Sequence, residues 1–267
     1  MGLGSINRSS STQMAQTFVN DRIRRVLEAA HLVSQITSDA QAHFESAVLP
    51  AVAPSVADHG AAAGALLALL RAAEDGVTAV LRRAVDVFIT QLERVLYSEQ
   101  RRADFVPRDD ALSFDRPTSA CLMGTGMLSA LGAAAHDTLE GPNLTALLSE
   151  VGRRTHAVLL QHMGRYTYSP TGALKWKKDV AEYAEALGAY GVPAVDEEMA
   201  ALQQTVNVLV VAPESLMGLV NGSLRMAHRD ALRVISLRED FKTAKVDGKT
   251  LGQLFSGAVE GVMSIRV

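Results

Sequence analysis

The sequence predicts an all-α protein of about eight helices joined by short loops. Apolar residues recur at spacings of three and four in one segment after another, and no segment sustains the period-two alternation of a strand. Aromatic residues are only 5% of the 267 residues, whereas Ala and Leu, which favour helices, are abundant. Gly and Pro mostly separate the periodic segments, so they mark the expected helix ends.

The first expected helix covers about residues 17–48. Pro50 and Pro54 should end it, because proline lacks the backbone N–H that a helix needs. Residues 1–16, which begin with a Gly/Ser-rich stretch, are expected to be a disordered leader. The apolar stripe of the helix consists of Val19, Ile23, Val26, Ala30, Val33 and Ala40.

A long second helix is expected over about residues 62–102, after a short loop that contains His59 and Gly60. Forty residues at 1.5 Å per residue would span about 60 Å, so the sequence predicts either an elongated molecule or a kink near Gly76. Residues 17–102 are therefore assigned to a first helical bundle, and the polar residues 103–116 to a linker loop.

The remaining residues, 117–267, are assigned to a C-terminal helical bundle organised around a hairpin from Gly172 to Ala212. Each half of this hairpin carries one apolar stripe, and Gly191 and Pro193 suit the end of one helix and the start of the next. The other expected elements are helices over about 117–139, 144–162, 213–222 and 228–237, a turn at 246–249, and an amphipathic segment through Leu251, Leu254, Phe255 and Val259.

Charge and cysteine content limit the class of protein. The formal net charge of −3 argues against a nucleic-acid binder, which gains affinity by neutralising phosphates. One cysteine, Cys121, excludes an internal disulfide and suits a reducing cytosol. No signal peptide and no run of about 20 apolar residues is visible, so we expect a cytoplasmic protein that does not span a membrane.

Sequence motifs for catalysis or cofactor binding are weak. Gly124, Gly126 and Gly132 match a dinucleotide-binding loop poorly, and close helix packing explains them better. His156 and His162 are six residues apart, which does not suit two metal ligands on one helix face. We therefore expect no cofactor and no metal. A helical enzyme that uses Cys121 with His136 stays an alternative, although a buried thiol is the simpler interpretation of Cys121.

Basic residues gather at three places that could contact a partner or acidic lipid headgroups. Asp179, Glu182 and Glu185 lie on the same expected helix as the last of these clusters, so a solvated face with internal ion pairs is the simpler interpretation, and a contact with lipid is the alternative. The candidate contact residues are Arg82, Arg83, Arg101, Arg102, Lys175, Lys177 and Lys178.

Several short elements, taken together, resemble the exocyst complex component five family, also called the Sec-ten subunit. Residues 99–108 (EQRRADFVPR) resemble its Gln-basic-basic-x-Asp-Phe-x-Pro element, and residues 118–121 its Thr-x-Ala-Cys element. Residues 139–152, 162–183, 192–193, 210–216 and 237–241 are similar to later elements in the same order. The positions that match and that we expect to be structural are Asp104, Phe105, Pro107, Cys121, Gly172, Asp179, Tyr183, Pro193, Pro213 and Arg238.

The resemblance covers about residues 20–245 and corresponds to the C-terminal part of a longer family chain. It implies a rod of stacked antiparallel helical bundles, as in multisubunit tethering complexes. It also implies a non-enzymatic role in tethering secretory vesicles to the plasma membrane before SNARE-mediated fusion. The implied partners are other exocyst subunits, small GTPases and, indirectly, phosphoinositide membranes.

Two further alternatives stay open. Recyclin-type F-box proteins of endosomal recycling share this C-terminal region, and an F-box upstream would identify one. A generic helical scaffold is the other alternative, in which case the match to the family would be accidental.

Overall fold

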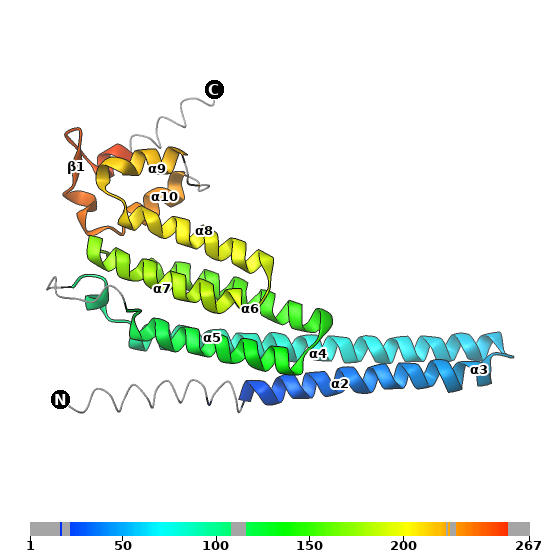
Figure 1. The fold of residues 1–267 in the computed structure, drawn as a ribbon. Coiled ribbons are helices and arrows are strands. Elements are labelled where there is room, and N and C mark those ends of the chain that lie inside the picture. The colour runs from blue at the N-terminus through cyan, green and yellow to red at the C-terminus, as the bar shows by residue number, and fades with distance from the viewer. Residues whose placement is uncertain (1–16, 18–21, 108–115, 223, 225–227, 256–267) are drawn as a thin grey trace, which may run out of the picture. The chain divides into compact units, whose positions relative to one another are not determined.

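The structure is a computed structural model that describes residues 17, 22–107, 116–222, 224 and 228–255. Within these residues the all-α prediction is confirmed, because nine α-helices account for most of the chain (Figure 1). The helices are α2 Arg24–His43, α3 Leu49–Val52, α4 Val56–Glu99, α5 Ser119–Thr138, α6 Gly141–Met163, α7 Pro170–Gly188, α8 Pro193–Val210, α9 Leu216–Gly222 and α10 His228–Ile235. Shorter elements are a π-helical turn, Phe44–Val48, the 3-10 turns Arg102–Asp104, Pro213–Ser215 and Glu239–Lys242, and the strands β1 Lys245–Val246 and β2 Lys249–Thr250.

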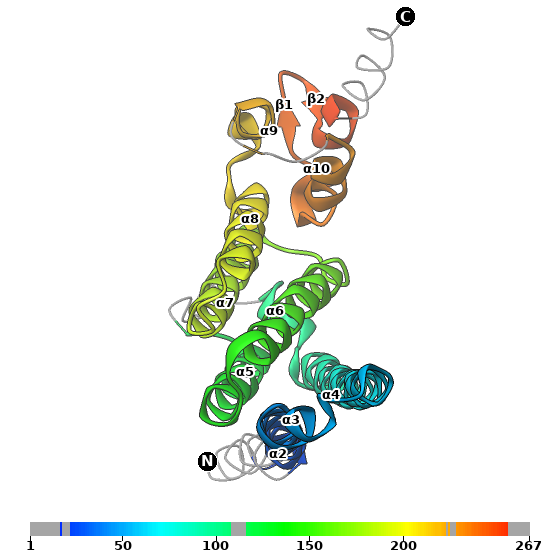
Figure 2. The ribbon, with the colours of Figure 1, turned by 90° about the vertical axis from the view of Figure 1, so that its right-hand side faces the viewer.

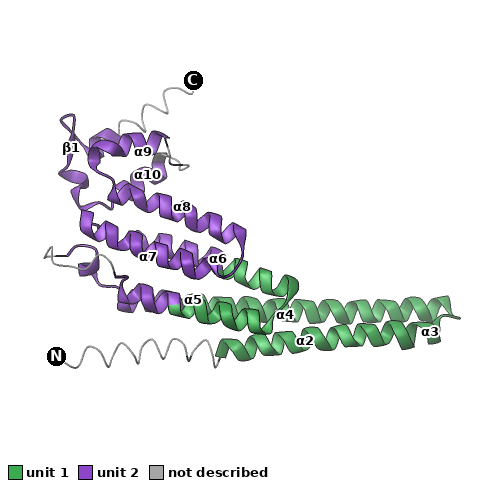
Figure 3. Ribbon diagram, in the orientation of Figure 1, with its two compact units in different colours: residues 1–91, 126–151 green, residues 92–125, 152–267 purple. Residues whose placement is uncertain are grey.

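The chain divides into two compact units (Figure 3). Unit 1 comprises residues 1–91 and 126–151, and unit 2 comprises residues 92–125 and 152–267. Helices α4, α5 and α6 each contribute residues to both units. The division into two helical bundles, residues 17–102 and 117–267, stays a prediction. The predicted leader, residues 1–16, lies outside the described residues.

In unit 1, α2 and α4 lie side by side and antiparallel (Figures 1 and 2). Asp137 on α5 forms an ion pair with Arg24 of α2 at 3.5 Å, and Asn143 on α6 donates a hydrogen bond to Ser34 of α2 at 3.5 Å. The buried apolar residues of this unit include Leu27, Ala30, Val77, Leu81, Phe88, Leu128, Leu131, Leu147 and Val151.

The helix ends of unit 1 differ from the prediction. Pro50 does not end the first helical segment but lies inside α3. The π-helical turn before it lets the N–H of Leu49 bond to the carbonyl of Phe44, five residues earlier, so the backbone widens just before the proline. Ser55 then caps α4 by accepting the N–H of Asp58 at 3.3 Å, so His59 and Gly60 lie in the helix and not in a loop.

The long helix was correctly predicted, and it runs without a break past Gly76 (Figure 1). Its 44 residues are rich in Ala and Leu, which are strong helix formers. A Cβ on Gly76 would meet no atom within 4 Å, so this glycine serves neither a kink nor a close contact.

The predicted hairpin is confirmed in unit 2 as α7 and α8. Ser169 caps α7 by accepting the N–H of Gly172 at 3.0 Å, and Pro170 and Pro193 stand in the first turns of the two helices. Gly191 has φ +68°, a conformation that glycine adopts at little cost. Short α9 and α10 follow at about the predicted positions.

A two-stranded antiparallel ladder, which was not predicted, follows α10. Lys245 pairs with Thr250, and Val246 pairs with Lys249. The turn between them was predicted, and Asp247 and Gly248 have φ of 52° and 77°, as a two-residue hairpin turn requires. Leu251 and Phe255 just after it are buried, whereas Val259 of the same predicted segment lies outside the described residues.

Candidate functional site

Two of the residues that carry the family resemblance, Cys121 and Asp179, meet in unit 2, where Asp179 is a buried carboxylate. Asp179, on α7, accepts hydrogen bonds from the backbone N–H and the hydroxyl of Thr118, both at 2.8 Å. Thr118 precedes α5, and its hydroxyl oxygen accepts the N–H of Cys121 at 3.1 Å, so it caps that helix. One carboxylate thus joins the N-terminus of α5 to the middle of α7.

Burial dominates the electrostatics of this carboxylate. Asp179 is fully buried, and the loss of solvation raises its pKa to about 6, although the hydrogen bonds from Thr118 oppose this shift. Its place beside the N-terminus of α5 favours the charged form in the same direction as those hydrogen bonds. The carboxylate is therefore held mainly by hydrogen bonds, and no cation among the described residues is in hydrogen-bond contact with it.

Gln100 extends the polar cluster toward α6. Its side-chain N–H donates to Asp104 at 2.9 Å, and its oxygen lies 3.4 Å from Nε2 of His162 and 3.5 Å from the hydroxyl of Thr118. The single hydroxyl hydrogen of Thr118 points to Asp179, which is nearer, so the Gln100 oxygen accepts the Nε2–H of His162. Burial lowers the pKa of His162 to about 4, so its imidazole is neutral at pH 7. Only one of its two ring nitrogens then carries a hydrogen that it can donate.

Phe105 lies at the centre of an aromatic cluster in unit 2. It is fully buried, and its ring lies 5.1 Å from that of Tyr166, 4.9 Å from that of Tyr168 and 5.7 Å from that of Trp176. Its carbonyl accepts the backbone N–H of Ser169 at 3.0 Å. The predicted polar linker therefore contains a core residue, because the Phe105 side chain packs on the connection between α6 and α7 and on Trp176 of α7. Pro107 is half-buried.

Two glycines allow close approach of the elements around the cluster. A Cβ on Gly172 would overlap the carbonyl group of Phe105, and a Cβ on Gly124 would overlap the hydroxyl of Tyr183. The Tyr183 hydroxyl donates to the carbonyl of Ala120 at 3.4 Å. Gly124 therefore serves close packing, as its sequence context suggested.

The geometry does not support the alternative that Cys121 is a nucleophile. The thiol is buried, its sulfur lies 3.5 Å from the carbonyl oxygen of Asp179, and burial raises its pKa far above the ordinary range. His136 lies fifteen residues further along α5 and is exposed. A thiol that stays protonated is a poor nucleophile.

Arg238 holds the C-terminal part of unit 2 to the hairpin. Its Nη1 donates to the carbonyls of Val208 at 3.0 Å and Val211 at 2.6 Å, so it satisfies the otherwise unpaired end of α8. Its Nε and Nη2 donate to both oxygens of Asp240, each at 2.8 Å. Pro213 opens the 3-10 turn that follows α8.

The basic cluster on α7 is self-paired only in part. Lys178 forms an ion pair with Glu182 at 2.8 Å, but Asp179 faces the core. Arg82 and Arg83 belong to unit 1, whereas the remaining members belong to unit 2. All of these side chains are at least partly exposed, and their contact with a partner or with lipid stays a prediction.

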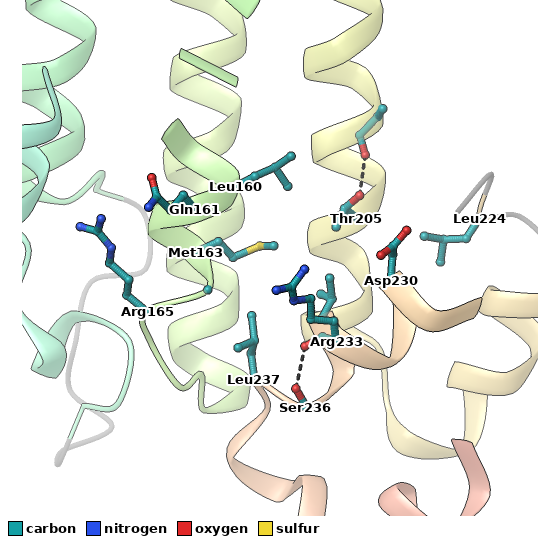
Figure 4. Close-up of a pocket in the computed structure, with 13 residues that line it drawn as sticks. Leu160, Gln161, Met163, Arg165, Thr205, Leu224, Asp230, Arg233, Ser236 and Leu237 are labelled. Atoms are coloured by element: carbon teal, nitrogen blue, oxygen red, sulfur yellow. Dashed lines mark hydrogen bonds between the residues drawn. The ribbon is translucent and has the colours of Figure 1, made fainter. Parts of the chain in front are cut away.

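Sequence reasoning missed a groove of about 990 Å³ in unit 2, between the end of α6, α8 and α10 (Figure 4). The hydroxyl of Thr205 donates to the carbonyl of Ala201 at 2.9 Å, and that of Ser236 to the carbonyl of Arg233 at 2.7 Å. Both of these hydroxyls are thus bonded to carbonyls of their own chain segment, so the charged side chains are the main polar groups of the groove. The lining residues include Leu160, Met163, Leu224, Val234, Leu237, Arg165, Arg233 and Asp230.

A signal for part of this site was present in the sequence. Asp179 falls between Trp176 and Tyr183 on the apolar stripe of α7, which places it on the inward face. Its partner Thr118 comes from a distant segment, which a local pattern does not identify. Among the described residues, no group of three or more His, Cys, Asp or Glu side chains could hold a metal ion, and none of the helices is long and apolar enough to cross a bilayer.

Comparison with known proteins gives consistent matches. A model of the family described as "Exocyst complex component Sec10-like, alpha-helical bundle" matches residues 2–250. The chain is 36% identical over 207 residues to "Exocyst complex component 5" of Oryza sativa subsp. japonica, which covers 77% of this chain and 26% of that protein. It is 35% identical over 210 residues to "Exocyst complex component SEC10a" of Arabidopsis thaliana, over 78% of this chain and 25% of that protein.

The similarity extends to animals. "Exocyst complex component 5" of Homo sapiens is 28% identical over 167 residues, which covers 61% of this chain and 23% of the human protein. The chain thus spans about a quarter of the length of the relatives that it matches.

Proposed function

Because the chain belongs to the Sec10-like helical-bundle family of exocyst complex components, we propose that it acts within an exocyst complex as a non-enzymatic subunit. In this role it helps tether secretory vesicles to the plasma membrane before SNARE-mediated fusion. The observation that carries the proposal is the family match over residues 2–250, together with relatives from plants and animals that bear exocyst names.

The geometry of unit 2 supports a role in binding over a role in chemistry. Its buried polar groups are used to join helices: Asp179 to Thr118, Gln100 to His162, and Arg238 to the end of α8. A site for a reaction needs a reactive group that is accessible and positioned beside an acid, a base or an anion-stabilising group. The reactive thiol of this unit is buried and protonated instead.

The partners proposed for the chain are other exocyst subunits, with small GTPases and phosphoinositide membranes as further partners. The place of action is the cytoplasmic side of the plasma membrane at sites of exocytosis, where the chain is a peripheral component. Arg101 and Arg102 are exposed in unit 2, and Arg82 and Arg83 are exposed in unit 1, so both pairs are accessible to anionic headgroups. Lys177 is also exposed.

The experiment that tests assembly is affinity capture of the tagged chain from its own cells, followed by quantitative mass spectrometry. We expect other exocyst subunits to be enriched over a tag-only control. The alternative of a recyclin-type F-box protein receives no support from the comparisons, and it predicts recovery of ubiquitin-ligase adaptors instead. Recovery of those adaptors, or of no exocyst subunit, would overturn the proposal.

The membrane contact is tested separately by flotation with vesicles that contain phosphoinositides. Reversing the charge of Arg101 and Arg102 to Glu should reduce co-flotation if this pair contacts the headgroups. A second variant, with Arg82→Glu and Arg83→Glu, reverses the same number of charges in unit 1 and tests the other pair. Equal flotation of both variants and of the unaltered chain would exclude these arginines as lipid contacts.

A further inference from the structure

The groove of unit 2, between the end of α6, α8 and α10, has a mainly apolar wall. Leu160 and Met163 come from α6, Val234 comes from α10, and Leu237 follows α10 (Figure 4). Leu160 points from α6 toward α8 and is 37% exposed, so an apolar side chain of the wall is accessible. The volume of about 990 Å³ lies at the upper end of the range that small-molecule sites occupy. The groove therefore offers an apolar surface that is large enough for an organic ligand.

The wall offers few hydrogen-bonding groups to the body of a ligand. The hydroxyls of Thr205 and Ser236 donate to carbonyls of their own segment, at 2.9 Å and 2.7 Å. Gln161 and Arg165 also line the groove, but their polar ends point away from α8 and α10 in Figure 4. An extended peptide would lose water from its N–H and C=O groups here without gaining partners, which costs free energy. A hydrocarbon chain has no such groups, so it suits this wall better.

Two opposite charges stand on α10 at the groove. Asp230 and Arg233 are spaced i, i+3, so they are neighbours on the helix surface, with Cβ atoms about 5–6 Å apart. Both are exposed, and neither forms an ion pair with any residue that the structure describes. Figure 4 shows the two side chains diverging, with Arg233 directed toward Met163 of α6. The groove thus presents one cation and one anion that are both available to a ligand.

This pair of charges is complementary to a zwitterionic headgroup. In phosphocholine and phosphoethanolamine, two carbon atoms join the phosphate to the ammonium, so the two charges are about one helical turn apart. A guanidinium binds phosphate oxygens through its fork of N–H donors, and a carboxylate attracts an ammonium. A purely anionic headgroup would be attracted by Arg233 but repelled by Asp230, and a purely cationic one would meet the reverse. The two residues therefore favour a headgroup that carries both charges.

We propose that the groove between α6, α8 and α10 binds a single-chain zwitterionic phospholipid, which in chemical terms is a lysophospholipid. Its acyl chain lies against Leu160, Met163 and Val234. Its phosphate binds Arg233, and its ammonium faces Asp230. The inference is drawn from the groove alone and does not require the tethering role.

The test is isothermal titration calorimetry of the full chain with four amphiphiles of equal chain length, each below its critical micelle concentration. They are dodecylphosphocholine, dodecyl phosphate, dodecyltrimethylammonium and uncharged dodecyl maltoside. We expect dodecylphosphocholine to bind at least fivefold more tightly than each of the other three. Arg233→Glu should weaken its binding at least fivefold. Asp230→Asn should weaken binding of dodecylphosphocholine but tighten binding of dodecyl phosphate, because a repelling carboxylate is removed. Leu160→Asp should weaken binding of all four.

Two matched controls carry the same charge changes outside the groove. Arg229→Glu lies on α10 at an exposed residue that does not line the groove, and Leu174→Asp lies on α7 at a residue that is 44% exposed. Both should keep the affinity of the unaltered chain for dodecylphosphocholine, and circular dichroism should show equal helix content in all variants.

Equal binding of the four amphiphiles, binding of none of them, or an equal loss in the controls would overturn the proposal. Binding of an amphipathic helical peptide that Leu160→Asp abolishes, without binding of dodecylphosphocholine, would overturn it by assigning the groove to a protein partner.

Discussion

The carboxylate of Asp179 accepts two hydrogen bonds at 2.8 Å from Thr118, a residue 61 positions earlier in the chain. The same threonine caps α5, so the carboxylate fixes the start of one helix against the middle of another. A charged group is costly to bury, and here hydrogen bonds offset the cost without a salt bridge from any described residue. The stability of unit 2 should therefore respond to pH through this residue.

Asp179→Asn should change the pH dependence of stability in a defined direction. Burial raises the pKa of Asp179 to about 6, above its ordinary value of 3.8, so the folded chain binds this proton more tightly than the unfolded chain. The contribution to the free energy of unfolding is present below pH 4 and is lost as the pH rises through 6, by about 3 kcal/mol. Relative to the unaltered protein, the Asn variant should gain about that amount between pH 4 and pH 7.

The measurement is urea unfolding followed by circular dichroism at a series of pH values. Asp196→Asn is a suitable control, because Asp196 is exposed on α8. A stability difference between the Asp179→Asn variant and the unaltered protein that stays constant with pH would contradict the assignment.

His162→Gln should change the pH dependence in the opposite direction. Burial lowers the pKa of His162 to about 4, below its ordinary value of 6.5, so the unfolded chain binds this proton more tightly. Its contribution is present above pH 6.5 and is lost as the pH falls toward 4, again by about 3 kcal/mol. The contributions of Asp179 and His162 oppose each other between pH 4 and 6. The Gln variant should therefore be relatively more stable at pH 4 than at pH 7 in the same unfolding series. A variant with the pH profile of the unaltered protein would disprove this role of the imidazole.

Helix positions were more predictable than the contacts between helices. The α7–α8 hairpin could be predicted because Pro170, Gly191 and Pro193 act through local backbone geometry. The interpretation of Asp179 as part of a solvated face was wrong, because it faces the core even though neighbouring Lys178 and Glu182 pair at the surface.

Pro50 and Phe105 also differ from the prediction, each for its own reason. Pro50 was expected to end a helix, but a π-helical turn accommodates it. Phe105 was assigned to a polar linker, but it is fully buried among aromatic rings that come from later segments. For Phe105, the distant segments that pack on it override the polar character of its own segment.

Gly172→Ala should destabilise the protein strongly. A Cβ at this position would overlap the carbonyl carbon and oxygen of Phe105, which are backbone atoms that cannot move aside without disturbing the hydrogen bond to Ser169. We expect a loss of about 3 kcal/mol or more in the free energy of unfolding, measured in urea.

The matched control for this substitution is Gly126→Ala, in α5. A Cβ there would meet no atom within 4 Å, so the change should stabilise the helix by up to about 1 kcal/mol through helix propensity alone. Equal effects of the two substitutions would show that helix propensity, and not the close contact at Phe105, determines the response.

The Cys121 thiol should be protected from modification in the folded protein. It is buried, and burial raises its pKa, so both access and thiolate formation are suppressed. Labelling with a chromogenic disulfide reagent should be at least a hundredfold slower in buffer than in concentrated guanidinium chloride. Rapid labelling of the native protein, with the kinetics of a free thiol, would instead restore an accessible cysteine as a candidate nucleophile.

Arg238→Lys should cost nearly as much stability as Arg238→Met. The guanidinium satisfies carbonyls at the end of α8 with one nitrogen while its other two nitrogens bind both oxygens of Asp240. An ammonium group is a single point of charge and is unable to bridge both sites in this geometry. Both variants should lose about 3 kcal/mol, because buried carbonyls and a carboxylate are left without donors.

The free energy of unfolding in urea measures this loss. Arg233→Met, on the exposed side of α10, is the control and should change stability by less than about 0.5 kcal/mol. If Arg238→Lys kept the stability of the unaltered protein, the positive charge alone would matter at this position. The simultaneous hydrogen bonds to the end of α8 and to Asp240 would then contribute nothing to stability.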